Sequence, residues 1–419
     1  MTSALSILPQ ELWDHVIDLL RKDRDALATC SLTCRVWLPT ARTHLWHRVQ
    51  CTTPAHLPRL QVLIRQYPDL AAMVVELDVH LIFRNLHRLA LFPNLRTLTL
   101  HRLHSKAYRL DQEPVIRNWT RPLASIVALS LQECDISTVM LGWLLHIMPS
   151  TKSLILPEGT SIMYLGSHSS TDAPCRLEHV WWILYFAKQG PLRLLLSPLC
   201  STLQEATLVC IPYTGHGQYR ATSACDFEES SRMLRSASTY LRTLSLLLPN
   251  VLRHQSTAFR AGIGRLDLSD NRSLTSLHIA LNGANTRDWT DGPAAVLARL
   301  PPTLDALRRV DIYTLLRPHE HLLQRPRRPH QEQLDHEITR LLRDHRDLVV
   351  TFHVRGHVQD AEPARGSITK RLRTSSPWLE AEAERLRFSH EFVADPATYV
   401  WEPGWQELDT AGSIPLFAV

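Results

Sequence analysis

A six-residue phrase recurs along most of this chain and limits the folds that the chain can adopt. Apolar residues occupy its fourth and sixth places, and usually its first. Alternation over so short a run is typical of a half-buried strand, and recurrence every 21 to 40 residues indicates a solenoid of stacked repeats. The phrase begins at residues 74, 95, 126, 151, 177, 203, 241, 274, 307 and 347, where it reads VVELDV, LRTLTL, IVALSL, TKSLIL, LEHVWW, LQEATL, LRTLSL, LTSLHI, LRRVDI and DLVVTF.

The segments between the phrases can form helices, for example over 137–147 and 292–300, and proline-containing turn signals follow them. A strand, a helix or loop and another strand, repeated in parallel, predict a curved α/β solenoid. The phrases are similar to leucine-rich repeats in an irregular form. Two alternatives stay open. Ordinary α/β folds also contain Leu-x-Leu strands, and IGRLDLSDN from residue 263 competes with LTSLHI from residue 274 for the position of one strand.

The third and fifth residues of each phrase are expected to point outward from the sheet. Repeat proteins bind other proteins through such a face, and Trp is enriched among the residues that dominate binding energy. Trp181 is the one large aromatic residue in the outward column, although it and Trp182 could instead be buried under neighbouring loops. The candidate substrate-contacting residues are His179, Trp181, Glu205, Thr207, His278 and Arg309.

The first 50 residues have a different pattern, which predicts three short helices within 8–46. Asp23 can cap the second helix, and Pro39 opens the third. On the first helix, six large apolar residues share one arc and charged residues share the other. Helices this small cannot cover so much apolar surface among themselves, so either the rest of the chain or another protein covers it. The six apolar residues of the first helix are Leu12, Trp13, Val16, Ile17, Leu19 and Leu20.

The landmarks of this stretch are Leu8-Pro9 with Glu11-Leu12, then Ile17 and Leu20, Leu27, Cys34-Arg35 with Trp37, and Leu45-Trp46. In their order and spacing they resemble the F-box family, whose members dock on the Skp-type adaptor of cullin ubiquitin ligases. The alternative is a helical hairpin buried in its own domain. The resemblance implies a role in adaptor binding or in the helical core, without separating the two, for Leu8, Pro9, Leu12, Val16, Ile17, Leu20, Leu27, Cys30, Cys34 and Trp37.

Composition and motifs argue against several other classes of protein. The chain has 419 residues, 44% of them hydrophobic and 21% charged, as in a globular protein. A net charge of +5 on a chain of this length does not indicate nucleic-acid binding. We expect no membrane span, because no run of eighteen apolar residues occurs, and no secretory signal. The eight cysteines lack metal-binding spacing, so we expect reduced thiols in the cytoplasm or nucleus.

No motif of a catalytic site is present, whether a phosphate-binding glycine loop, a nucleophile elbow or a zinc-protease helix. We therefore expect a non-catalytic chain without a cofactor or a metal ion. The predicted organisation is a helical F-box domain over 1–50, a connector helix within 51–72, the repeat solenoid over 73–355, and a linker, short helix from Pro377 and cap or tail over 356–419.

The resemblance implies the substrate-recognition subunit of an SCF-type ubiquitin ligase. The N-terminal helices would bind the Skp-type adaptor, and through it the cullin, while the repeats would hold a protein substrate. The alternative is a non-catalytic scaffold with an F-box and no role in ubiquitination.

Overall fold

The computed structural model describes residues 9–51, 53, 55–80, 83–103, 122–157, 160–163, 175–185, 200–211, 225–249, 263, 265–282, 291–315, 329–356, 366, 384–392 and 414–415. The chain divides into two compact units. The first comprises Met1–Ile162 with Asp172–Cys175, and the second Met163–Thr171 with Arg176–Val419. The N-terminal helices and the first strands belong to the first of these units. No described helix is long and apolar enough to span a membrane.

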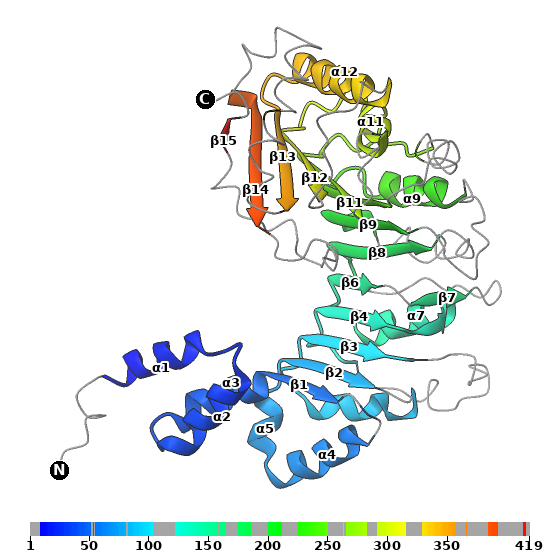
Figure 1. Cartoon of the computed structure of the whole chain (residues 1–419). Helices are drawn as coiled ribbons and strands as arrows, with labels where there is room; N and C mark the ends of the chain where they lie inside the picture. Colours follow the sequence, from blue (N-terminus) through cyan, green and yellow to red (C-terminus); the bar gives the residue numbers. More distant parts are fainter. Residues whose placement is uncertain are drawn as a thin grey trace, which may run out of the picture. The chain divides into compact units, whose positions relative to one another are not determined.

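Three helices begin the first unit, as the sequence predicted: α1 (Gln10–Leu19), α2 (Arg24–Thr33) and α3 (Leu38–His47). The Asp23 carboxylate accepts a hydrogen bond from the Ala26 N–H and so caps α2, as expected. Pro9 occupies the cap position that precedes α1 rather than the first helical residue, and no side chain caps this end of the helix. Figure 1 shows α3 leading into β1, with α2 beside α3.

Two further helices connect this trio to the repeats: α4 (His56–Gln66) and α5 (Pro68–Met73). The connector was predicted as a single helix. Pro68 separates the two, because proline lacks the N–H that would continue the hydrogen-bond ladder and suits the first turn of a new helix. Leu57, Leu60 and Ile64 form the buried side of α4.

The sheet of the first unit is parallel, with strand order β1, β2, β3, β4, β6. The 3₁₀ helix η2 (Phe83–Leu91) and helix α7 (Thr138–Ile147) lie between strands in the chain. A separate two-stranded sheet joins β5 (Asp135–Ser137) to β7 (Ser161–Met163). The strands of the main sheet are β1 (Arg48–Cys51), β2 (Glu76–His80), β3 (Thr97–His101), β4 (Ala128–Gln132) and β6 (Ser153–Leu156).

In the second unit, the strands from β8 to β14 pair in chain order and in parallel, and β15 joins β14 in antiparallel fashion. Figure 1 shows its helices on one side of these strands. The helices are η5 (Cys200–Thr202), α9 (Cys225–Ser236), α11 (Asp291–Leu297) and α12 (Pro329–Asp344). The strands are β8 (His179–Tyr185), β9 (Glu205–Ile211), β10 (Thr243–Pro249), β11 (Ser276–Asn282), β12 (Arg309–Leu315), β13 (Val349–Gly356), β14 (Leu386–Phe392) and β15 (Ile414–Pro415).

Each of the ten sequence phrases contains a strand, and each strand begins at the third residue of its phrase. LTSLHI forms β11, so IGRLDLSDN is not the strand of that repeat. The fourth and sixth residues point into the core, as predicted, and nineteen of these twenty have described side chains that are at most 2% exposed. They are Leu77, Val79, Leu98, Leu100, Leu129, Leu131, Leu154, Leu156, Val180, Ala206, Leu208, Leu244, Leu246, Leu277, Ile279, Val310, Ile312, Val350 and Phe352.

The C-terminal prediction was partly wrong. A short helix was expected from Pro377 to Phe388, but Leu386–Phe392 is the strand β14, which pairs with β13. Leu386 and Phe388 are buried at alternate positions, and this period of two matches a strand rather than a helix. Residues 377–383, Trp401 and Trp405, which include most of the predicted helix and the two tryptophans of the predicted cap, lie outside the described residues.

Candidate functional site

Helix α1 presents a row of large apolar side chains to solvent. Leu12, Val16 and Leu19 follow one another at helical spacing and are 50%, 46% and 73% exposed. Ile17, on another side of the same helix, is 1% exposed. The sequence placed all four residues on one apolar arc, and the structure buries only one edge of that arc. We call Leu12, Val16 and Leu19 the α1 stripe.

The core of the helical trio is small. Ile17 of α1, Leu27 of α2 and Ala41 of α3 are its buried members. Leu20, Cys30, Trp37 and Leu45 are partly buried and pack around them. The rings of Trp13 and Trp37 also meet, with centroids 5.0 Å apart and planes tilted by 47°.

A seam of polar contacts holds α1 against α3. Gln10 Nε2 donates to the Val36 carbonyl at 3.3 Å, the Thr40 hydroxyl donates to the Asp14 carboxylate, and His44 Nε2 lies 2.6 Å from Asp18 Oδ1. Each contact joins residues 26 positions apart, so the two helices run in the same direction. Polar residues of α1 therefore face its neighbour while the α1 stripe faces water.

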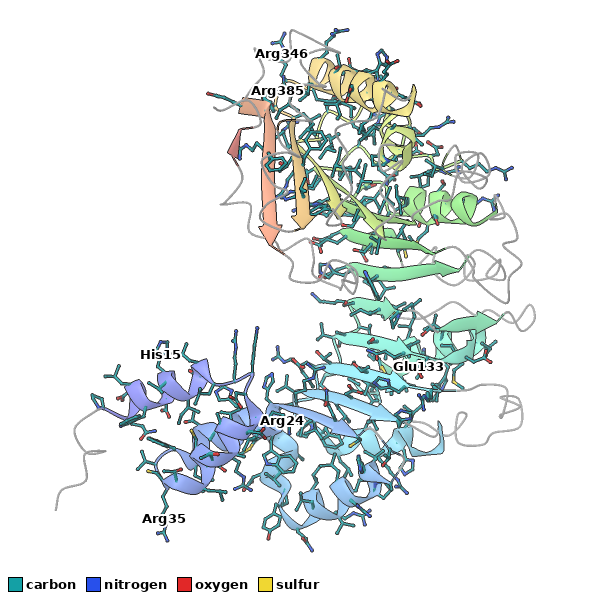
Figure 2. All side chains as sticks on the ribbon, viewed as in Figure 1. His15, Arg24, Arg35, Glu133, Arg346 and Arg385 are labelled. Carbon is teal, nitrogen blue, oxygen red and sulfur yellow. The ribbon has the colours of Figure 1, made fainter. Side chains whose placement is uncertain are left out.

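Helices α2 and α3 are joined more firmly. Arg24, at the start of α2, donates to the carbonyls of Leu45 and Arg48 at the end of α3, at 3.5 and 3.1 Å. Figure 2 labels Arg24, which lies between the helical trio and β1. At the other end of this pair, Leu32 is 88% exposed, and Val36 and Leu38 are exposed as well. We call Leu32, Val36 and Leu38 the α2–α3 patch.

The structure shows which of the ten predicted residues lie in the helical core and which are exposed, a distinction that the sequence did not make. Among the ten residues assigned to adaptor binding or helical core, Ile17 and Leu27 are core, and Leu20, Cys30, Cys34 and Trp37 are half-buried around it. Pro9, Leu12 and Val16 are exposed, whereas Leu8 lies outside the described residues. The set omitted Leu19, Leu32, Val36 and Leu38. Their signal was present, because each is an apolar residue in a helical segment too small to bury it.

The candidate substrate-contacting residues lie on the outward face of the second unit, where some are accessible and others are buried. His179 and Trp181 on β8 are half-buried, Glu205 on β9 is exposed, and His179 Nδ1 lies 3.0 Å from Glu205 Oε2. This contact lowers the pKa of Glu205. Thr207 and His278 are only 7% and 5% exposed, so they cannot contact a partner without a rearrangement. Arg309 keeps partial exposure.

A buried charged cluster explains the position of His278. Asp311 on β12 is fully buried, and its carboxylate lies 2.9 Å from His278 Nδ1, 3.0 Å from His353 Nε2 and 2.5 Å from Arg309 Nε. Tyr313 stacks on His353 with centroids 4.3 Å apart. The parallel register pairs Asp311 with His278 on β11 and Tyr313 with His353 on β13, so all four side chains share one face. We call these five residues the Asp311 cluster.

The cluster keeps Asp311 ionised. Burial by itself raises the pKa of this carboxyl group, but the hydrogen bonds and charges of His278 and His353 lower it by more, and the pKa lies below its ordinary value. A buried carboxylate with three cationic or hydrogen-bonding neighbours is compensated in place. The cluster therefore orders three neighbouring strands rather than offering an open site.

The first unit carries histidine–carboxylate contacts on the outward face of its own sheet. His101 on β3 pairs with Asp78 on β2, and its ring stacks on His80 with centroids 5.5 Å apart. Burial, together with the positive charges of His101 and Arg102, lowers the pKa of His80. Unlike the Asp311 cluster, these groups stay partly exposed.

The described cysteines show no reactive or metal-binding arrangement. Burial raises the pKa of Cys51 and Cys175 to about 11 and that of Cys134 to about 12. The Cys134 thiol donates to the Leu100 carbonyl of the neighbouring strand at 3.3 Å, a structural role. Within the described part of the chain, no group of three or more metal-ligating side chains is placed to hold an ion.

Comparisons with known proteins do not assign the chain to a family. No protein-family model matches it, and no curated protein matches it.

Proposed function

We propose that this chain is a substrate-recognition subunit of an SCF-type ubiquitin ligase, with an F-box-like helical trio and an irregular leucine-rich-repeat-like region. The observation that carries the proposal is the exposure of the α1 stripe and the α2–α3 patch on a folded helical trio. Contiguous apolar surface of this kind marks protein–protein interfaces. The resemblance of residues 8–46 to the F-box supplies the kind of partner, a Skp-type adaptor that links the chain to a cullin.

In this proposal the repeats hold the protein to be ubiquitinated, and the chain itself catalyses nothing. It raises the local concentration of the substrate beside an enzyme carried by the same complex. His179, Trp181 and Glu205 support this role because they combine an aromatic residue with charged groups and remain accessible. Thr207 and His278 contribute to the fold of that face instead.

The test is adaptor recovery from a cell extract with surface variants of the full chain. Leu12→Ser with Leu19→Ser removes two members of the α1 stripe without entering the helical core, so we expect the adaptor to be lost while the circular dichroism spectrum is unchanged. Val62→Ser is the matched control, because Val62 is 57% exposed on α4, outside the helical trio. Full adaptor recovery with the double variant contradicts the proposal. Leu8→Ala with Pro9→Ala is expected to weaken recovery as well.

The rival function, a scaffold without a role in ubiquitination, is separated from this one by two measurements. A ligase subunit co-purifies with the cullin as well as the adaptor, and a bound protein accumulates when the subunit is removed. Affinity purification of the full chain and of a chain lacking residues 1–50 distinguishes the two groups of partners. Proteins lost with the helices are ligase components, and proteins retained are substrate candidates.

A further inference from the structure

The way that α1 packs is unusual for a helix that belongs to a fixed core. Ile17 is its only fully buried side chain, while the α1 stripe faces water. An amphipathic helix in its final position turns its apolar face inward. Helix α1 instead turns Asp14 and Asp18 toward α3.

The polar contacts that hold α1 are weak ones, and Ile17 is its main apolar contact with the core. The seam of Gln10, Asp14 and Asp18 is accessible to water, and exposed polar and ionic contacts contribute little to stability. No side chain caps the start of α1, and no basic residue lies in its last turn. Helix α2, by contrast, is capped by the Asp23 side chain.

Two buried donors show that the observed packing is incomplete. The indole Nε1 atoms of Trp13 and Trp37 are shielded from water, and neither has a hydrogen-bond partner among the described residues. A buried N–H without an acceptor is costly. The two rings contact each other, so movement of α1 away from α3 would uncover both indole groups.

We infer that α1 is a displaceable arm, which rests on α3 through the polar seam in the free chain and leaves it when the adaptor binds. Displacement allows the α1 stripe to lie on the adaptor and opens the Trp13 and Trp37 indole groups to acceptors. The pair of α2 and α3 stays in place as the fixed part of the trio. This inference rests on the proposed function for the identity of the partner.

The experiment tethers α1 in the full-length chain. Asp14→Cys with Thr40→Cys places a thiol on each side of the seam, and a short thiol–thiol crosslinker joins them. The matched control is the single variant Asp14→Cys carrying the one-ended form of the same reagent, which adds similar bulk without a tether. The unaltered chain treated with the crosslinker controls for reaction at native thiols such as Cys30 and Cys34, which are partly accessible. Mass spectrometry of peptides verifies the link.

We expect the tethered chain to bind purified Skp-type adaptor at least tenfold more weakly than both controls. Affinities that agree within twofold overturn the displaceable arm but leave the proposed function standing. If the unaltered chain does not bind the adaptor, the proposed function fails. Hydrogen exchange of the free chain then decides the inference separately. Amides of α1 that exchange at least tenfold faster than those of α2 support it, and equal rates overturn it.

Discussion

His353 Nε2 on β13 lies 3.0 Å from Asp311 Oδ1 on β12, on a part of the sheet face from which water is excluded. The two residues are 42 positions apart in the chain. Their contact links consecutive repeats through side chains, on the face that a repeat protein usually leaves open for a partner. On the outward face of the second unit, the third residue of each phrase stays at least partly exposed from β8 to β13, whereas the fifth residue is buried from β9 to β13.

Removal of the Asp311 carboxylate should destabilise the second unit strongly. Asp311→Ala leaves Arg309, His278 and His353 without their counter-ion, and breaking a buried ion pair on one side costs about 3–5 kcal/mol. The free energy of unfolding, from chemical denaturation followed by circular dichroism, measures this. Asp347→Asn is the control, because its pair with Arg308 is exposed and contributes at most about 1 kcal/mol. Equal effects of the two variants would show that the cluster is not a stabilising feature.

The Asp311 carboxylate should make the free energy of unfolding depend on pH. The pKa of Asp311 is lowered from its ordinary value of 3.8 in the folded chain, so below that value the unfolded chain binds more protons than the folded one. The stabilisation is therefore present at neutral pH and is lost progressively as the pH falls below about 4. Chemical denaturation of the unaltered chain and of Asp311→Asn at pH 7 and pH 3 tests this. The difference between the two proteins should shrink at pH 3, and a constant difference would contradict the assignment.

Replacement of two nearby apolar residues of α1, Ile17 and Leu19, should change the stability of the helices by very different amounts. Ile17→Ala opens a cavity in the small core of the trio and is expected to lower the stability of the helices by about 2–5 kcal/mol. Leu19→Ala removes an exposed side chain and should change stability by no more than about 0.5 kcal/mol. Hydrogen exchange of the α1 amides measures both effects. Similar exchange in the two variants would mean that α1 packs differently from the structure.

Arg385 should stabilise the end of α12. Its guanidinium donates to the carbonyls of Leu342 in the last turn of the helix and of His345 and Leu348 just after it. Figure 2 labels Arg385 near this helix. We expect Arg385→Ala to cost about 1–3 kcal/mol, because these partly buried acceptors lose their donor. Thermal unfolding measures the loss. Arg387→Ala, which removes an exposed arginine two residues along β14, is the control and should have little effect.

The strands and N-terminal helices could be predicted because their signals are local. A phrase such as LRTLTL places Leu98 and Leu100 on one side of a strand whatever surrounds it. The strands β1 and β14 were missed for the complementary reason. Arg48–Cys51 is too short to show alternation. The residues just before Leu386–Phe392 have a composition typical of a helix, so the sequence predicted a helix there instead of a strand.

The candidate sites were predicted less completely. Apolar residues in excess of what three helices can bury indicated an interaction surface, but the periodicity could not show which edge of the arc on α1 stays in water. The outward column was read correctly as a set of positions, yet the burial of Thr207 and His278 depends on groups far away in the chain.

By itself, the sequence determined where the strands begin, which of their side chains enter the core, and that the N-terminal segment forms three helices with more apolar surface than they can enclose. These are consequences of side-chain spacing within a few residues. Only the tertiary structure decided that Asp14 and Asp18 face α3 while Leu12 and Leu19 face water, and that Asp311 gathers His278 and His353 around a buried charge. Those relationships join residues 26 to 42 positions apart, and chain folding, rather than local spacing, brings them together.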